Sequence, residues 1–342
     1  MLTRLRQSGF TLIELMISAT LGLVLLAALA TLFLQSRQSF RQNDLIVGMQ
    51  DQARFALATL SRDLTAAGYW GGLASSDDIS LAANVDELTT ANDCGADTST
   101  AWAKEVTRRV EFLNNATQAQ VAASYHCIDS TRFVADTDVF ATRRVATAAT
   151  ASMDAVAVSA TLRQNHFYLK SNGVTATLFR QTGSAVHTPG APDVPLQPPM
   201  DFYRYYPRIY YVRDYAFDVG DGIPSLCRRE LEPETSPSDN TPYLAEECIA
   251  VGIQDLQLTW GVDLDNDLAV DQYLTAPTAA QLAGAMVARV QILVRAIDEN
   301  PQYLNQKTYT LGDRTTVYTA ADDDHYSRRI YSTTVKLRNR DY

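Results

Sequence analysis

The hydrophobic and polar positions divide the chain into an apolar run, an amphipathic stretch and an alternating remainder. No residue from Leu15 to Leu34 is charged, and this length matches the roughly 20 residues that a helix needs to cross a bilayer. After Leu34, apolar residues recur at steps of three or four, which is the period of an amphipathic helix. They are Leu45, Met49, Ala53, Ala56, Leu60 and Leu64. The pattern predicts a membrane-spanning segment that continues into a helix docked on a domain.

The helix is expected to be continuous. No proline occurs between Met1 and Ala67, and Gly68 follows at the position of a C-terminal cap. We expect one helix from about Phe10 to Ala67, which is on the order of 85 Å long at a rise of about 1.5 Å per residue. In residue numbers, the helical segment is 10–68, its transmembrane part is about 15–34, and the globular domain is 69–342.

After Tyr69 the period becomes alternating, which is typical of half-buried antiparallel strands. The predicted strands are Gly252–Trp260, Met286–Ala296, Met153–Leu162, Thr175–Gln181, Arg208–Arg213 and Ile330–Arg338. The stretch Pro189–Pro207 holds six of the 12 prolines, so we expect an irregular connection there, which is a candidate boundary between two lobes. The expected fold class is α+β, with a long helix packed on an antiparallel sheet domain.

The charges before the apolar run predict how the chain crosses the membrane. Arg4 and Arg6 precede the run, and cationic residues on that side hold the N-terminus in the cytoplasm. The domain should then be periplasmic or extracellular. A cleaved secretory signal would end in a small-residue cleavage site after a shorter apolar run, and no such site is clear. The net charge of −10 repels a phosphate backbone, which argues against nucleic acid as a partner.

The four cysteines form two spaced pairs, and an even number in an exported region indicates disulfides. Three pairings are formally open. We favour Cys94–Cys127 and Cys227–Cys248 because each closes a local loop, and the chain-entropy model gives about 3–4 kcal/mol for each. Zinc is the alternative, but no CxxC or HxxxH spacing supports it.

One carboxylate, Glu14, stands at the start of the apolar span. A carboxylate there costs on the order of 2.5 kcal/mol or more unless it is paired or lies at the interface. An ordinary membrane anchor leaves Glu14 unexplained. An interfacial carboxylate without a role is the alternative interpretation.

The segment Arg6–Glu14 resembles the class III signal of type IV prepilins and type II secretion pseudopilins. The resemblance implies that a prepilin peptidase removes the leader, residues 1–9, by cutting after Gly9, and that the new N-terminal residue, Phe10, is methylated. It also implies a partner for Glu14, the cationic amine of a neighbouring subunit. Opposite charges that meet in an apolar bundle relieve each other's desolvation, so Glu14 is predicted to act in assembly.

Further segments resemble PilW-type minor pilins, although J-type pseudopilins share parts of the first. They are Ala53–Tyr69, Gly222–Arg229, Val251–Leu258 and Ser327–Arg340. The resemblance implies a minor pilin that primes pilus assembly at or near the pilus tip. The membrane half lacks the helix-kinking proline that many major pilins carry, which also favours a minor pilin or a pseudopilin. Residues 75–200 resemble no family that we can name.

The resemblance also implies the partners and the location of the chain. The partners are other minor and major pilins, a tip adhesin, the prepilin peptidase and the inner-membrane assembly platform. The chain would cross the bacterial inner membrane once and then enter an extracellular pilus. The alternatives are a pseudopilin of type II secretion and a membrane-anchored periplasmic binding protein that does not polymerise.

An acidic loop between two predicted strands is a candidate calcium site. Asp263, Asp265, Asp267 and Asp271 are spaced as in the first nine positions of an EF-hand loop. Crowded carboxylates repel one another without a cation, which favours the site. However, Leu268 stands where the sharp turn uses glycine, and Leu274 stands where the closing glutamate would be. A solvated acidic hairpin loop is the alternative. The second acidic cluster, Asp322–His325, lacks the alternate spacing and is interpreted as a charged loop.

The sequence does not predict an enzyme. The four histidines stand apart from one another with no motif around them: His126, His166, His187 and His325. No P-loop, GxSxG or GxGxxG motif is present. Structural histidines account for all four, so we expect the chain to be a substrate of processing enzymes and to need no cofactor other than the candidate calcium ion.

Overall fold

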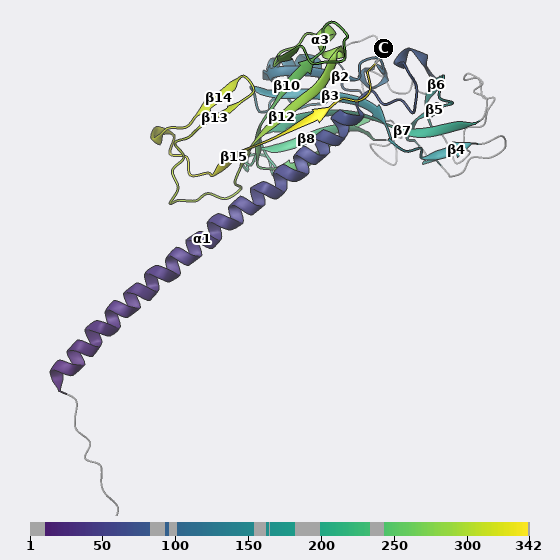
Figure 1. The fold of residues 1–342 in the computed structure, drawn as a ribbon. Coiled ribbons are helices and arrows are strands. Elements are labelled where there is room, and N and C mark those ends of the chain that lie inside the picture. Colours follow the sequence, from purple (N-terminus) through teal and green to yellow (C-terminus); the bar gives the residue numbers. More distant parts are fainter. Residues whose placement is uncertain are drawn as a thin grey trace, which may run out of the picture. The chain divides into compact units, whose positions relative to one another are not determined.

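The computed structural model describes residues 11–82, 93–95, 101–153, 162–163, 165–181, 199–232 and 243–340. Contacts divide the chain into two compact units, Met1–Gly48 and Met49–Tyr342. Helix α1, Leu12–Ala66, begins in the first unit and ends in the second (Figure 1). The α+β layout predicted from the sequence is confirmed.

The first unit contains the apolar part of α1. The helix extends over 55 residues in all and is long and apolar enough to cross a membrane. Large apolar side chains from Leu12 to Leu34 are exposed in this unit. The single continuous helix that the sequence predicts is therefore present, although its expected first residue, Phe10, lies outside the described residues.

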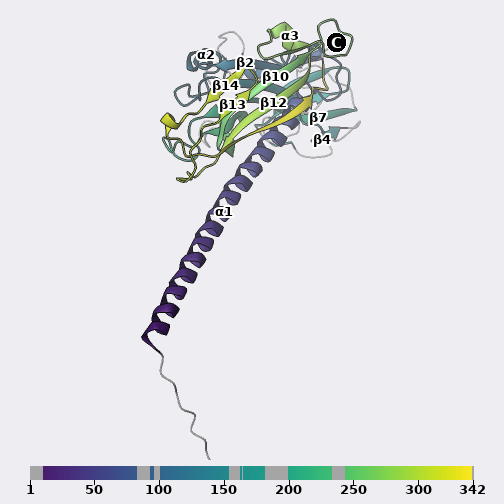
Figure 2. The same cartoon turned by 60° about the vertical axis from the view of Figure 1, so that its left-hand side comes forward.

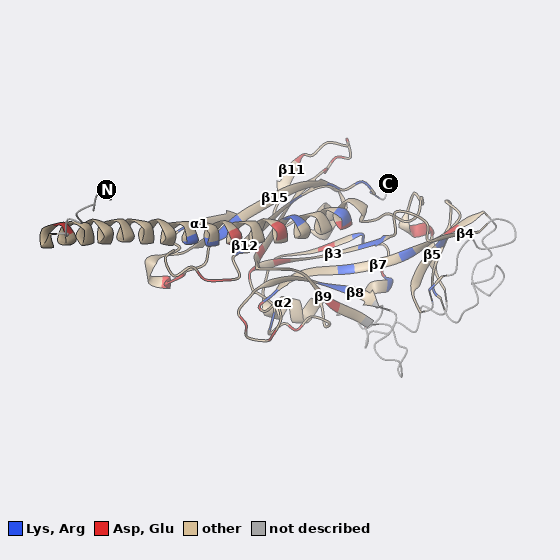
Figure 3. Ribbon diagram, turned by 90° about the horizontal axis from the view of Figure 1, so that it is seen from below, with Lys and Arg blue, Asp and Glu red and all other residues tan. Residues whose placement is uncertain are grey.

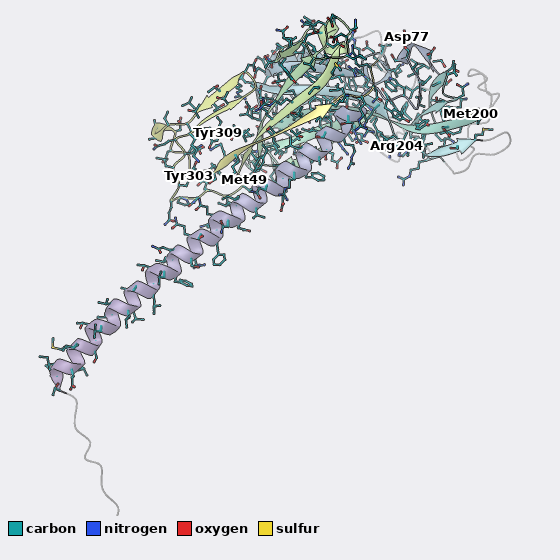
Figure 4. The ribbon with its side chains drawn as sticks, in the orientation of Figure 1. Met49, Asp77, Met200, Arg204, Tyr303 and Tyr309 are labelled. Atoms are coloured by element: carbon teal, nitrogen blue, oxygen red, sulfur yellow. A yellow bond between two sulfur atoms is a disulfide. The ribbon has the colours of Figure 1, made fainter. Side chains whose placement is uncertain are left out.

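The last part of α1 belongs to the second unit and buries the predicted apolar stripe. Met49, labelled in Figure 4, is the first buried residue, and the stripe continues with Ala53, Ala56, Leu60 and Leu64. The helix ends before Gly68, which has a φ of +75° and whose N–H donates to the carbonyl of Arg143 at 2.9 Å. A Cβ at this position would lie 2.9 Å from the Asn339 carbonyl oxygen, so both the backbone angle and the available space require glycine.

The larger sheet of the second unit has nine strands, and its main path runs in the order β1, β6, β5, β7, β3 and β2. Their bounds are β1 Ile79–Leu81, β6 Ala176–Arg180, β5 Phe167–Ser171, β7 Met200–Arg213, β3 Thr137–Val145 and β2 Val110–Ala116. The strands β4 (Ala151–Met153) and β8 (Ser225–Glu232) also pair with β7, and β9 (Tyr243–Val251) pairs with β8. All these pairs are antiparallel except β1 with β6.

The prediction of an irregular connection over Pro189–Pro207 is wrong for its last part. Residues 200–207 form the first half of β7, whereas residues 182–198 lie outside the described part of the chain. Pro207 is opposite Arg143 in β3. The Arg143 N–H donates to the Arg109 carbonyl, and the Arg143 carbonyl accepts from the Gly68 N–H, so neither group of Arg143 bonds to Pro207. The β7–β8 pairing begins only at Arg208. The strand therefore accommodates Pro207 because the missing N–H falls at the end of a ladder.

A second sheet is formed by β11, β10, β12 and β15 in that order, and β13 and β14 form a hairpin. The bounds are β10 Ile253–Val262, β11 Gln272–Leu274, β12 Ala285–Arg295, β13 Thr308–Leu311, β14 Arg314–Val317 and β15 Arg328–Lys336. Strand β10 packs against β2, β3, β7 and β8 of the larger sheet. Figure 2 shows β10 beside β12 and near β2. The described part of the unit also contains two short α-helices, α2 (Gln118–Ser124) and α3 (Ala279–Ala283), and short 3-10 helices at Ser76–Asp78, Trp102–Lys104 and Ala320–Asp322.

The predicted strands correspond to β6, β10, β12, β15 and the second half of β7, with shifts of a few residues at their ends. The segment Met153–Leu162 is described only at its two ends, where β4 ends at Met153.

Both disulfides are present in the second unit. Cys94 bonds to Cys127, and Cys227 bonds to Cys248 across the β8–β9 pair. The bonds close loops with sequence separations of 33 and 21 residues. Each bond is therefore worth about 3–4 kcal/mol in the chain-entropy model.

A buried carboxyl links the two sheets and makes the stability of the second unit depend on pH. Asp138 in β3 is fully buried and accepts from the backbone N–H of Asn115 at 2.9 Å and of Leu258 in β10 at 2.6 Å. Burial raises the pKa of Asp138 well above its ordinary value, the two N–H donors oppose this rise, and the nearby Asp255 and Asp313 add to it.

We expect Asp138 to lower stability as the pH rises. Because its pKa is higher in the folded than in the unfolded chain, the unfolded chain loses the proton first, from about pH 4 upward. The loss accumulates until the pH passes the raised pKa. Thermal unfolding of the detergent-solubilised full chain, compared with Asp138→Asn, measures this effect. The midpoint of the wild type should fall relative to that of the variant between about pH 4 and the raised pKa, and a constant difference would contradict the assignment.

Candidate functional site

The N-terminal turn of α1 holds Glu14 in a capping box with Thr11. The Thr11 backbone N–H donates to Glu14 Oε2 at 3.1 Å, and the Thr11 hydroxyl donates to the same oxygen at 3.0 Å. In return the Glu14 N–H donates to Thr11 Oγ1 at 3.3 Å. The sequence Thr-x-x-Glu at a helix start is the pattern of this motif, so the sequence contained a signal for this local role that our sequence analysis missed.

The capping box leaves one carboxylate oxygen of Glu14 available. All three hydrogen bonds of the box use Oε2 or the Thr11 hydroxyl, and Oε1 makes no hydrogen bond to any residue that the structure describes. Glu14 can therefore cap its own helix and still accept a cation. Gly9 and Phe10, the predicted cleavage and methylation positions, lie outside the described residues.

The apolar side chains around Glu14 are not buried by other residues of the first unit. Leu12 is 79% exposed, and even the least exposed large apolar residue between Leu12 and Leu34, Ile17, is 53% exposed. A continuous apolar surface of this length is not stable in water. Such a surface suits contact with lipid or with apolar helices.

Asp63, near the end of α1, forms ion pairs with arginines of the larger sheet. Its side chain is completely buried. Arg144 in β3 donates to Oδ1 at 2.6 and 3.0 Å, and Arg208 in β7 donates to both oxygens at 2.9 and 3.0 Å. The Tyr210 hydroxyl donates to Oδ2. Burial raises the pKa of Asp63, but Arg208, Arg144 and Tyr210 outweigh it, and the pKa is below its ordinary value.

Our sequence analysis missed Asp63, although a signal was present. Asp63 follows Leu60 by three residues and precedes Leu64, so it lies on the buried face of the helix. A carboxylate on such a face requires cationic partners. Its partners come from 81 and 145 residues further along the chain, and the sequence alone does not identify them.

The acidic loop brings together three of its four predicted ligands. Oxygens of Asp263, Asp265 and Asp267 lie within 4.8 Å of one another, whereas Asp271 is outside this group and accepts from the Leu264 N–H at 2.6 Å. The turn at Leu268, where an EF-hand uses glycine, has a φ of +70°. The loop therefore adopts the left-handed turn with a leucine, at some cost in strain.

An arginine already neutralises part of this loop. Arg340 Nη1 lies 2.7 Å from Asp263 Oδ2, and this hydrogen bond lowers the pKa of Asp263. Leu274, at the position of the closing glutamate, pairs with Trp260 in the β10–β11 ladder. The calcium site remains a prediction.

Calorimetry on the detergent-solubilised full chain tests the calcium prediction. We expect calcium uptake that Asp265→Ala abolishes, because this change removes one of the three convergent carboxylates. We also expect Arg340→Ala to tighten binding, because Asp263 would lose its competing cation. A wild-type chain that takes up no calcium, or uptake that Asp265→Ala leaves unchanged, would contradict the prediction.

The histidines described by the structure do not converge. His325 contacts the Tyr303 carbonyl at 2.7 Å and Asp323 at 3.2 Å, while His126 and His166 lie elsewhere and His187 is outside the described residues. In the part of the chain that the structure describes, the carboxylates of the acidic loop form the one group with metal-ligand geometry.

Comparison with known families gives one match at each end of the chain. A family model described as Type IV Pilus-assembly protein W matches residues 209–339, from the second half of β7 to just past β15. A model described as Prokaryotic N-terminal methylation motif matches residues 4–30. No curated protein and no solved structure matches the chain.

One matched family is described by pilus assembly and the other by methylation of the N-terminus. The methylation motif coincides with the start of the apolar helix, and the PilW match covers β8 to β15 and the Cys227–Cys248 disulfide. Together with the α+β layout, these two matches show that the chain is similar to PilW-type type IV pilins at both of its ends.

Proposed function

We propose that this chain is a type IV pilin, a minor subunit that primes assembly of a type IV pilus, at or near the tip, in a complex with other minor pilins and an adhesin. The observation that carries the proposal is an exposed apolar helix that begins with a methylation motif and leads into a PilW-like domain. The helix can join a fibre. The large acidic domain, with two disulfides, suits contacts with protein partners.

We assign each segment of the chain a step in membrane insertion, processing and assembly. The chain enters the bacterial inner membrane with Arg4 and Arg6 in the cytoplasm and its domain in the periplasm. The prepilin peptidase removes residues 1–9, and Phe10 is methylated. The helix, residues 10–68, then leaves the membrane and packs in the fibre, while residues 69–342 meet other subunits.

Glu14 has a defined part in this proposal. Its Oε2 caps the helix through Thr11, so its Oε1 can pair with the Phe10 amine of a neighbouring subunit. The ion pair removes the cost of carrying a lone carboxylate through an apolar bundle. The apolar side chains of the helix supply the rest of the contact.

A pseudopilin of type II secretion shares the N-terminal motif and is the second candidate. Deletion of the gene separates the two functions. A strain that lacks surface pili and still secretes its type II substrates, and that regains pili with the wild-type gene, supports the minor pilin. Loss of secretion with normal pili would overturn it.

A further inference from the structure

A cleft beside the end of α1 is lined by arginines in a chain whose net charge is −10. Its volume is about 550 Å³. One wall is α1 from Phe55 to Asp63, and the other is formed by β7, β8, β9 and the end of β3 with the residues that follow it. Figure 3 shows basic residues, in blue, on the strands β3, β7 and β8.

The described residues that line the cleft carry more positive than negative charge. Four arginines face two carboxylates, Asp63 and Glu247. Asp63 is buried and shared between Arg144 and Arg208, and Glu247 pairs with Arg228 at 2.7 Å. Arg62, on the helix wall, makes no ion pair with any residue that the structure describes. Glu230, which does not line the cleft, pairs with Arg208 at 2.8 Å and with Arg228 at 3.1 Å. The excess positive charge among the lining residues is therefore that of Arg62.

The Tyr206 ring lines the cleft and contacts three guanidinium groups, of which that of Arg204 lies beside the cleft and is not part of its lining. The Tyr206 ring lies 4.9 Å from Arg144, 5.1 Å from Arg204 and 4.7 Å from Arg208, measured from each Cζ to the ring centroid. Arg204, labelled in Figure 4, has this contact and no ion pair within the described part of the chain. Stacking fixes a guanidinium without using its N–H donors, so the Arg204 donors are available to an incoming anion.

The mouth of the cleft is apolar. Phe55 is 58% exposed, and Ala58 and Ile249 also line the cleft. An anion with an aliphatic stem or an apolar neighbour would satisfy both parts of the surface. A carboxylate matches the planar fork of arginine, whereas the nearby Glu247 disfavours a more highly charged phosphate.

We infer that this arginine cleft, lined by Arg62, Arg144, Arg208 and Tyr206 and flanked by Arg204, binds an aspartate or glutamate side chain of a neighbouring pilin, next to an apolar residue of that chain. The inference rests on the proposed function, since it needs a partner subunit. It assigns the cleft as a contact between globular regions, separate from the contact between helices that Glu14 makes.

Photo-crosslinking in cells tests the inference with the full chain. Thr147 lines the cleft and is exposed, so p-benzoylphenylalanine in its place reports on whatever occupies the cleft. We expect a crosslinked peptide from another pilin with an acidic residue beside an apolar one. The double variant Arg62→Glu, Arg204→Glu should lower the crosslink yield by about tenfold or more, because attraction becomes repulsion.

Two controls separate loss of contact from loss of fold. Arg54→Glu reverses an exposed charge on the same helix outside the cleft and should leave the yield unchanged. Reversal of the acidic residue of the partner to arginine should restore the yield in the double variant, which an unfolded domain would not allow.

Each alternative result overturns the inference. A crosslink to phospholipid, a peptide without an acidic residue, no crosslink, or a yield that does not respond to the double variant would do so. Mass spectrometry of sheared fibres from the same strain shows whether the proposed function falls as well. If the chain is in the fibres, only the cleft assignment fails, and if it is absent, both fail.

Discussion

Replacing Asp63 by alanine should destabilise the second unit by about 3–5 kcal/mol, which is the range for removal of one partner from a buried ion pair. Asp63 is fully buried, and its loss leaves Arg144 without a carboxylate partner among the described residues, while Arg208 keeps only Glu230. Thermal and urea unfolding of the detergent-solubilised full chain would measure the loss. The end of the helix should separate from the sheet at lower denaturant concentration.

Two companion variants show whether the loss comes from the buried charges. Asp51→Ala removes an exposed carboxylate from the same helix and should change the free energy of unfolding by less than about 0.5 kcal/mol. Adding Arg144→Met to Asp63→Ala removes one unpaired charge and should recover part of the loss. A loss from Asp63→Ala no larger than that of the Asp51 variant would contradict the role assigned to Asp63.

Replacing Glu14 by glutamine should reduce the amount of this subunit in fibres by about tenfold or more, while leaving its amount in membranes unchanged. Glutamine can still accept from Thr11 and keep the capping box, but it cannot neutralise the amine of a neighbouring subunit. An unpaired charge in an apolar bundle costs a few kcal/mol. Quantitative immunoblots of sheared fibres and of membranes measure both amounts.

The capping box supplies a matched control for this prediction. Thr11→Val removes the hydroxyl that bonds with Glu14 and leaves the carboxylate charged. We expect this variant to enter fibres nearly as well as the wild type. If Thr11→Val impairs incorporation as strongly as Glu14→Gln, the important role of Glu14 is capping, and the proposed ion pair is wrong.

The sequence predicted the parts of the fold that depend on local periodicity. The stripe from Met49 to Leu64 specified the buried face of α1, and strict alternation specified β10 and β12. The long strand β7 was only half predicted, because Pro207 indicates a break unless the ladder position is known. Whether a missing N–H matters depends on which strand lies beside it, and this is a property of the tertiary structure.

The functional residues, like the fold, were predictable only where the signal lies in the local sequence. Glu14 stood out because a carboxylate in an apolar run is costly wherever it lies. Asp63 and the arginine cleft depend on pairing between residues far apart in the chain, such as Asp63 with Arg208. A single arginine in a strand looks like a solvated charge until the strands around it are placed.

Mass spectrometry of sheared surface fibres tests the central claim most directly. If the chain is a type IV pilin, the fibres should contain a peptide of this chain that begins at Phe10 and carries a methyl group on its amine. Fibres that lack the chain, together with membranes that hold it with its N-terminus from Met1 to Gly9 intact, would contradict the claim.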